Sequence, residues 1–402
     1  MQKKYLLPVL VLVTMWSCSE GDPLHIITNT RIENGGIVRD TLYAMADTSI
    51  VYGKTSTGNS KKLMLGQYSG FESRFLIRFG QMPNDTIKVD SLRLVLTSVS
   101  NLGETESPIQ GSAYLVTEDW PESVNEDADW DFQSKIDQSD ETTAHFEIDA
   151  EAAQIHSIDL PPALIDVWRD TTGGGKNFGI LLDFNSATNI KEFSSVDALL
   201  SGQRPRLVVT YTNTKLDSVL HDTLFVNRDA SLVEFTGSFN PADLVVASGY
   251  AVRSYLNFDF SGVPSTAILS TMNMIIKRDT LTSLINKNRT EEMYLRVVKN
   301  SYDELPDTEI DSTFMQNVYY NVSLIKTDAN ELRIDPLDRG PASQRFLQDI
   351  LNGETPYGSF LIHYKNEGED ISIYKMMDQK ASDPDDRPRL IIEYYLVPDA
   401  RL

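Results

Sequence analysis

The sequence predicts an all-β protein made of two antiparallel β-sandwiches in tandem, and two observations support this. First, one strand motif occurs twice, as RPRLVVTY at 204–211 and as RPRLIIEY at 387–394. Each copy has a proline at its start, where a missing N–H costs least, and then alternates apolar and polar residues with period two. Second, the segments before the two motifs correspond to each other, with many short strands, turn signals and one short helix per copy.

Length and composition agree with this division. The chain has 402 residues, enough for two domains, and its 41% hydrophobic content is typical of a globular protein. Its formal charge of −22 argues against a nucleic-acid partner, because phosphate binding requires clustered Lys and Arg. The single cysteine excludes an intrachain disulfide and a cysteine metal cluster.

The first 17 residues have the pattern of a signal peptide. Lys3 and Lys4 form a positive start, and the apolar run at 6–13 is too short for an ordinary membrane-spanning helix. The only cysteine, Cys18, stands where a bacterial lipoprotein carries its acyl chain, so we expect lipidation there; the alternative is a plain secretory peptide. Residues 18–38 then form a polar tether, and their acidic start resembles the export signal of surface lipoproteins, which predicts an outer-membrane, surface-exposed location.

The first copy of the repeat covers residues 39–213. Its helix is expected to be capped by Asp159, to bury Leu164, Val167 and Trp168 on one face, and to end at the glycines of 173–175. The strands expected in this copy are DTLYAMAD (40–47), SRFLIRF (73–79), TIKVDSLRLVL (86–96), NFGILLDF (177–184) and the first RPRL motif.

The second copy covers residues 214–398. Its helix should begin at Pro341, bury Leu351 among other apolar residues and end at Gly353, and Tyr294-Leu295-Arg296 is matched with Tyr114-Leu115-Val116 of the first copy. The strands expected here are DTLFVNRD (222–229), VRSYLNF (252–258), AILSTMNMII (267–276), PYGSFLIHY (356–364) and the second RPRL motif.

In combination, these motifs resemble the DNRLRE domain, a group related to the disaggregatase repeats and to a carbohydrate-binding-module family that includes alginate binders. The resemblance covers residues 40–211 and, more loosely, 222–395. It implies two tandem jelly-roll-like sandwiches of an extracellular protein, which act as non-catalytic binding or structural domains.

Three tryptophans are candidates for stacking against a sugar ring. Trp168 falls on the apolar face of the expected helix, and Trp120 belongs to the family motif, so packing is expected for both. Trp130 stands in a run of acidic and polar residues and is therefore the candidate ligand-binding residue, although packing is its alternative.

Asp47 and Asp229 occupy equivalent positions in the two copies and are the candidate metal ligands. β-Sandwich modules often hold a structural Ca²⁺, which requires several oxygen ligands together; a solvated acidic turn is the alternative. No cofactor is otherwise expected. No H-E-x-x-H, G-x-S-x-G or phosphate-loop motif occurs, and no motif selects a pair of carboxylates, so we do not expect an enzyme.

The sequence thus predicts a cell-surface lipoprotein with two non-catalytic modules that bind polysaccharide. Loss of Lys3 and Lys4 with the signal peptide changes the charge from −22 to −24, which favours a neutral glycan over a polyanion unless Ca²⁺ bridges it. The alternative is a structural or adhesive spacer, or a subunit of an outer-membrane assembly with a protein partner. The arginines of the RPRL motifs are expected to pair with acidic residues.

Overall fold

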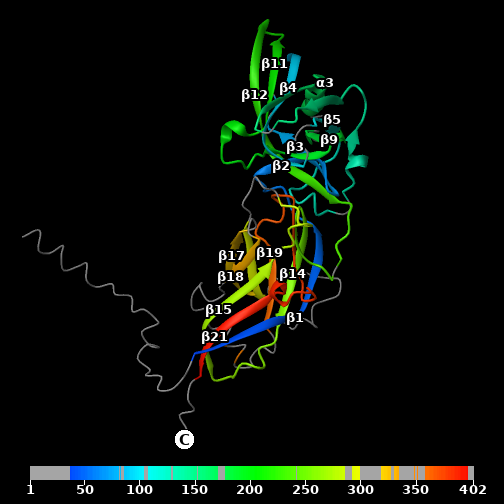
Figure 1. Ribbon diagram of the computed structural model, residues 1–402. Coiled ribbons are helices and arrows are strands. Elements are labelled where there is room, and N and C mark those ends of the chain that lie inside the picture. The colour runs from blue at the N-terminus through cyan, green and yellow to red at the C-terminus, as the bar shows by residue number, and fades with distance from the viewer. Residues whose placement is uncertain are drawn as a thin grey trace, which may run out of the picture.

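The computed structural model describes the chain from residue 37 to residue 396, with gaps at 81, 83–85, 104–106, 128–129, 152, 171–176, 241, 286–291, 299–317, 327–329, 335–347, 349–350 and 352–357. It consists of two antiparallel β-sandwiches stacked along the long axis of the molecule (Figure 1). The all-β prediction is therefore confirmed. The expected signal peptide, Cys18 and nearly all of the tether lie outside the described residues.

The first sandwich is built from a continuous stretch of chain. It contains β2 (Lys62–Tyr68), β3 (Phe71–Phe79), β4 (Ile87–Gly103), β5 (Ile109–Val116), β6 (Ile136–Asp137), β7 (Ala144–Ile148), β8 (Ile155–Leu160), β9 (Ile180–Ser186), β10 (Asn189–Ser194), β11 (Arg206–Asn213) and β12 (Ser218–Phe235), together with α3 (Ala163–Arg169) and the 3₁₀ turns η1 (Phe132–Lys135) and η2 (Ser201–Gln203). The 18-residue strand β12 pairs with β11 through its first half and with β3 through its second half. It therefore joins the two layers of this sandwich.

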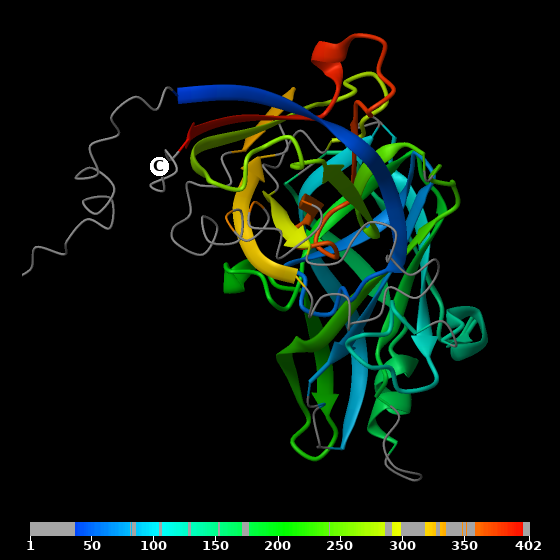
Figure 2. The same cartoon turned by 90° about the horizontal axis from the view of Figure 1, so that it is seen from below.

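The second sandwich takes its first strand from the other end of the chain. It contains β13 (Leu244–Ser248), β14 (Tyr250–Phe258), β15 (Ala267–Lys277), β16 (Glu292–Val298), β17 (Val318–Lys326), β18 (Glu331–Ile334), β19 (Gly358–Tyr364), β20 (Ser372–Met376), β21 (Arg389–Leu396) and the turn η4 (Pro384–Asp386), and it is completed by β1 (Ile37–Lys54). Strand β1 pairs with β21 through its first half and with β14 through its second half. Figure 2 shows β1, in blue, running beside β21, in red.

This placement of β1 differs from the order of the repeats. The segment DTLYAMAD was expected to open the first sandwich, but its strand partners all belong to the second. The physical reason is that β1 and β12 have the same length and the same spacing of aspartates. Either strand can therefore pair with an RPRL strand through its first half and with β3 or β14 through its second half. Strand β12 follows β11 through a tight turn and fills that position in the first sandwich, which leaves the second to β1. The ranges 39–213 and 214–398 thus delimit copies of the repeat, whereas the sandwiches are 62–235 and 244–396 with 37–54.

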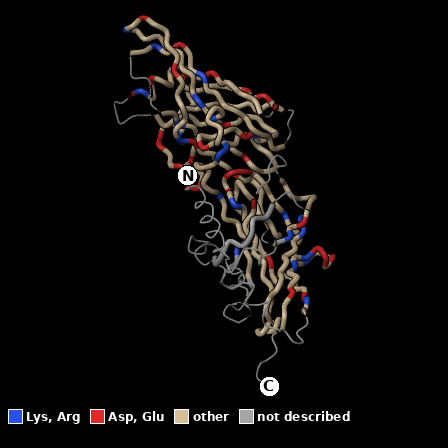
Figure 3. Tube along the Cα trace, turned by 90° about the vertical axis from the view of Figure 1, so that its left-hand side faces the viewer, with Lys and Arg blue, Asp and Glu red and all other residues tan. Residues whose placement is uncertain are grey.

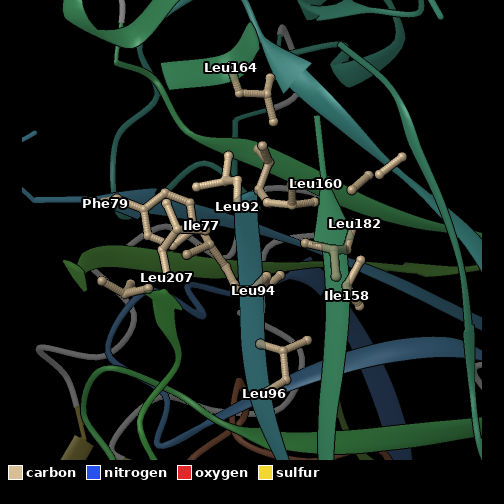
Figure 4. Packing of buried hydrophobic residues seen from close by; sticks show 14 of the residues in the cluster. Ile77, Phe79, Leu92, Leu94, Leu96, Ile158, Leu160, Leu164, Leu182 and Leu207 are labelled. Atoms are coloured by element: carbon tan, nitrogen blue, oxygen red, sulfur yellow. The ribbon is translucent and has the colours of Figure 1, made fainter. Parts of the chain in front are cut away.

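Period-two alternation places the apolar residues of each strand in the core. In the first sandwich, Leu92, Leu94 and Leu96 project in a row from β4 toward residues of β3, β8 and α3 (Figure 4). Trp168 of α3 is 4% exposed, and its ring centroid lies 5.4 Å from that of Phe79. The predicted packing role of Trp168 is therefore confirmed.

The predicted helix cap is wrong. The N-cap of α3 is Pro162, and no side chain caps the helix. Asp159 instead belongs to β8, where alternation directs its side chain to the surface and into an ion pair with Arg93 at 3.1 Å. Of the second predicted helix, Gln348 and Leu351 are described, both are helical, and Leu351 is buried in the core; Pro341 and Gly353 lie outside the described residues.

The RPRL strands close the two sandwiches in the same way. The Tyr211 hydroxyl donates to Asp222 of β12 at 2.9 Å, and the Tyr394 hydroxyl donates to Asp40 of β1 at 2.8 Å. Each closing strand is thus fixed to the 18-residue strand beside it.

The arginines of these motifs do not behave as expected. Arg204 Nε donates to the carbonyl oxygen of Ala198 at 3.1 Å, and Arg387 Nε donates to that of Ala381 at 2.8 Å. Arg206 and Arg389 likewise donate to carbonyl oxygens of the preceding loops. Within the described part of the chain none of the four forms an ion pair, because the loops before the strands present carbonyl oxygens nearer than any carboxylate.

A separate apolar cluster lies between the two sandwiches and joins them. Met64, Phe71 and Val233 of the first sandwich pack with Ile371 of the second, and Tyr250 lies against them. Acidic and basic residues are spread over both sandwiches (Figure 3). Among the described residues, no helix has the length and hydrophobicity needed to cross a membrane.

Candidate ligand-binding site

Residues 117–127 and 130–136 pack on the outer face of the first sandwich. Trp120 is 1% exposed, and its Nε1 donates to the carbonyl oxygen of Phe178 at 2.9 Å. Around it lie apolar residues from β3, β9 and β12, namely Leu76, Leu181, Ala230 and Leu232. The expected structural role of Trp120 is confirmed.

Trp130 belongs to the same cluster. Its ring is half-buried against it, and its Nε1 is buried without a hydrogen-bond partner. This environment corresponds to the packing alternative that the sequence left open. A role for Trp130 in ligand binding stays a prediction.

The two candidate metal ligands accept corresponding backbone hydrogen bonds in the two sandwiches. Asp47 Oδ2 accepts a hydrogen bond from the backbone N–H of Gln379 at 2.6 Å, and Asp229 Oδ2 accepts one from that of Val196 at 2.7 Å. Both N–H groups belong to the loop that precedes the RPRL strand. Each aspartate therefore fixes that loop to the 18-residue strand.

Burial raises the pKa of both carboxyls. It raises the pKa of Asp47, and it raises the pKa of Asp229 to about 7, because the ionised form is poorly solvated there. Asp229 Oδ1 is buried and has no hydrogen-bond partner. Within the described ranges, no three His, Cys, Asp or Glu residues are grouped as a metal site would require. Calcium binding at Asp47 or Asp229 stays a prediction.

A surface pocket lies at the turn between β2 and β3. Its volume is about 440 Å³, which is within the range of small-ligand sites. Tyr68 supplies a partly exposed aromatic ring, and the polar side chains come from three separate segments; they are Gln67, Ser69, Glu72, Thr188 and Thr236. An aromatic ring beside several hydrogen-bonding groups can bind a sugar, whose C–H face packs on the ring while its hydroxyls are paired.

The backbone fixes the tyrosine of this pocket. The turn residues Ser69 and Gly70 have φ values of 51° and 85°, which turn the chain tightly between the strands. The Tyr68 ring lies directly on Gly103, where a Cβ atom would be 2.5 Å from the Tyr68 Cδ2 atom, and Gly103 itself has φ of 100°. A residue larger than glycine at position 103 would therefore displace the Tyr68 ring.

The aromatic surface continues past the pocket toward the second sandwich. The rings of Phe71 and Phe235 are 4.7 Å apart, those of Phe235 and Phe239 are stacked at 4.5 Å, and Tyr250 lies beyond at 6.5 Å from Phe239. Phe235, Phe239 and Tyr250 are each partly exposed. The pocket is therefore bordered by further rings on which a chain of sugars could lie.

Buried arginines are a second feature that the sequence reading did not single out. Arg74 of β3 is 8% exposed and is surrounded by three carboxylates, with Asp183 at 2.8 Å, Glu72 at 3.3 Å and Glu234 at 3.4 Å. The alignment of SRFLIRF with VRSYLNF places Arg253 at the same position of the second copy, so the repeat itself carried this signal. Tyr68 had no such signal, because no motif of the repeat includes it.

No family model matches the chain, and no curated protein matches it. Among solved structures, it is similar to a chain of the structure titled "Structure of the Macrobrachium rosenbergii Nodavirus", with 9% identity and a TM-score of 0.12 over 99% of this chain and 96% of that one. A TM-score this low supports no conclusion about fold or function. The resemblance to the DNRLRE domain stays a prediction.

Proposed function

We propose that this protein is a lipid-anchored protein of the outer-membrane surface whose β-sandwiches bind polysaccharide without catalysis. The observation that supports this best is the pocket at Tyr68, where a partly exposed aromatic ring lies among Gln67, Glu72 and two threonines. The bordering rings of Phe235 and Phe239 suit a ligand longer than one sugar. The lipid anchor is proposed from the sequence, from Cys18 and the signal-peptide pattern before it.

Affinity electrophoresis of the purified protein in gels that contain neutral polysaccharides tests this function. We expect retardation by at least one polysaccharide and its loss in Tyr68→Ala. A central aromatic contact contributes about 2 kcal/mol or more to binding, which corresponds to a loss of affinity of about 30-fold. Tyr43→Ala is the matched control, because Tyr43 is an exposed tyrosine of the second sandwich. Equal retardation of wild type and Tyr68→Ala would place the site elsewhere, and no retardation in any gel would reject the function.

A structural role is the second candidate, supported by the way the sandwiches are joined. The apolar cluster around Phe71 joins them in one elongated body, as a spacer requires. Leu216, Val219 and Phe225 expose apolar side chains at the β11–β12 hairpin, at 70%, 59% and 60%. This reading predicts cross-linking to a protein partner that Leu216→Asp abolishes, with no affinity for glycans.

A further inference from the structure

The free end of the second sandwich carries a row of apolar side chains. Ile37 of β1 is paired with Tyr395 of β21, and Tyr395 is paired with Ile268 of β15. Opposite residues of antiparallel strands point to the same face of a sheet, so the three side chains form one row across three strands. Ile37 is 60% exposed, Ile268 is 38% exposed, and Tyr395 between them is half-buried. The row is therefore open on the outer face of the sheet.

This row is bounded by polar residues on one side. The next residues on the same face are Arg39, Glu393 and Thr271, which strand pairing again places across the three strands. Arg39 Nε lies 4.0 Å from a carboxylate oxygen of Glu393, and Thr271 Oγ1 donates to Glu393 at 3.2 Å. On the other side, Leu396 at the end of β21 is 37% exposed. The apolar surface is thus narrow and lies at the very end of the sandwich, which suits shallow contact with an apolar phase.

The first sandwich lacks this row at the equivalent position. Strands β12, β11 and β4 correspond to β1, β21 and β15, and their register places Val219 opposite Thr212 and Thr212 opposite Lys88. A hydroxyl and an exposed ammonium group therefore stand where the second sandwich has Tyr395 and Ile268. Both rows face outward, so packing of the core does not account for the difference between them.

The proposed lipid anchor is attached at the same end. The chain from Cys18 to Ile37 spans at most about 65 Å even when fully extended, and it ends in the row itself. Figure 1 shows β1, β15 and β21 at the lower end of the molecule, with the first sandwich and the apolar tip of its β11–β12 hairpin at the other end. An acyl chain on Cys18 would therefore keep the row nearer to the bilayer than the hairpin.

We propose that the row of Ile37, Tyr395 and Ile268 rests on the lipid surface in which the chain is anchored. The second sandwich then faces the membrane, and the first sandwich faces away from it. A tyrosine between aliphatic side chains suits the boundary between acyl chains and headgroups, because its ring is apolar and its hydroxyl is polar. The row is too small to hold the protein on a bilayer alone, so it acts together with the anchor, which raises its local concentration at the surface. This inference rests on the lipid anchor of the proposed function.

Tryptophan quenching by brominated lipid tests this orientation. The purified lipoprotein is reconstituted in phosphatidylcholine vesicles whose acyl chains carry bromine near the headgroup. Without the signal peptide, the tryptophans of the chain are Trp120, Trp130 and Trp168, all of the first sandwich. We expect brominated lipid to leave the emission of the wild type unchanged. Ile268→Trp should add emission that is lost in brominated vesicles and retained in unbrominated ones.

Two further variants make the result specific. Lys88→Trp places a tryptophan at the equivalent position of the first sandwich, and brominated lipid should not quench it. Ile37→Trp, at a more exposed position of the row, repeats the measurement if the larger ring at position 268 disturbs the fold.

Flotation of the vesicles measures anchoring separately from contact. If the protein floats but the tryptophans introduced at positions 268 and 37 are quenched no more than the one at position 88, the inference is overturned, the anchor stands, and the occupant of the row is a partner protein. If the protein does not float with the vesicles, the anchor and the inference are rejected together.

Discussion

Replacement of Asp229 by asparagine should raise the stability of the first sandwich above pH 7 and leave it nearly unchanged near pH 4. Asp229 lies on β12, is 1% exposed, and has a pKa raised to about 7 by burial, against an ordinary value of 3.8. The folded state therefore binds a proton between these pH values that the unfolded chain has released. Stability that is fully present below pH 4 is lost as the pH rises toward 7.

The size of the effect follows from this difference in pKa. A difference of about 3 units corresponds to about 4 kcal/mol above pH 7, at about 1.36 kcal/mol per unit. For a sandwich of this size, 1 kcal/mol changes the melting temperature by about 2–4 °C, so we expect a difference of about 10 °C to develop between pH 4 and pH 8. Asparagine has no charge to desolvate, and its Oδ1 can still accept from the Val196 N–H.

Thermal unfolding of wild type and variant across this pH range measures the effect. The asparagine amide group would be buried where Oδ1 of Asp229 has no partner, which lowers the melting temperature by the same amount at every pH. The quantity to compare is therefore the slope of the melting temperature against pH, rather than the melting temperature at one pH. Asp159→Asn removes the same charge from an exposed position and controls for net charge. Parallel curves for wild type and Asp229→Asn would refute the reasoning.

Three further predictions concern the closing strands and the anchor. A fragment of residues 56–238 should fold alone by circular dichroism, because all strand partners of β2 to β12 lie inside it. A fragment of residues 239–402 should fold only when a peptide of β1 is added, and folding without that peptide would contradict this. Tyr211→Phe and Tyr394→Phe should each cost about 1 kcal/mol in denaturant unfolding, and their effects should add because the hydrogen bonds lie in different sandwiches; a coupling larger than about 0.5 kcal/mol would argue against independence. Cys18→Ala should abolish fatty-acid labelling and release the protein from the membrane fraction, and a variant that stays labelled would show that the anchor is elsewhere.

The sequence predicted features that depend on local pattern. Alternation identified the RPRL strands, and helical spacing identified the buried face of α3, including Trp168. These succeed because period and burial are linked directly by strand and helix geometry. The prediction that Asp159 caps α3 is wrong because a residue before a helix can equally lie near the end of a strand, and the sequence pattern alone does not separate these two cases.

The sequence could not predict which of two similar segments pairs with a given strand, nor which residues distant in the chain come into contact. The strands β1 and β12 carry the same motif, so the sequence contains no signal for which sandwich each completes. The Tyr68 pocket depends on a close approach to Gly103, about 35 residues away in the chain, that only the structure reveals. The equivalence of the buried Arg74 and Arg253 could have been found, since it needs only the alignment of the two copies.

The pairing of Ile37 with Tyr395 has a topological consequence. The second of the two similar units is therefore made of two separate stretches of chain, with a break between the end of β21 and the start of β1. A circular permutant that links residue 396 to residue 37 and opens the chain at the turn after Asn213 would move the break to the other unit. It would keep every strand pair, with β21 and β1 now a hairpin and β11 and β12 the new ends.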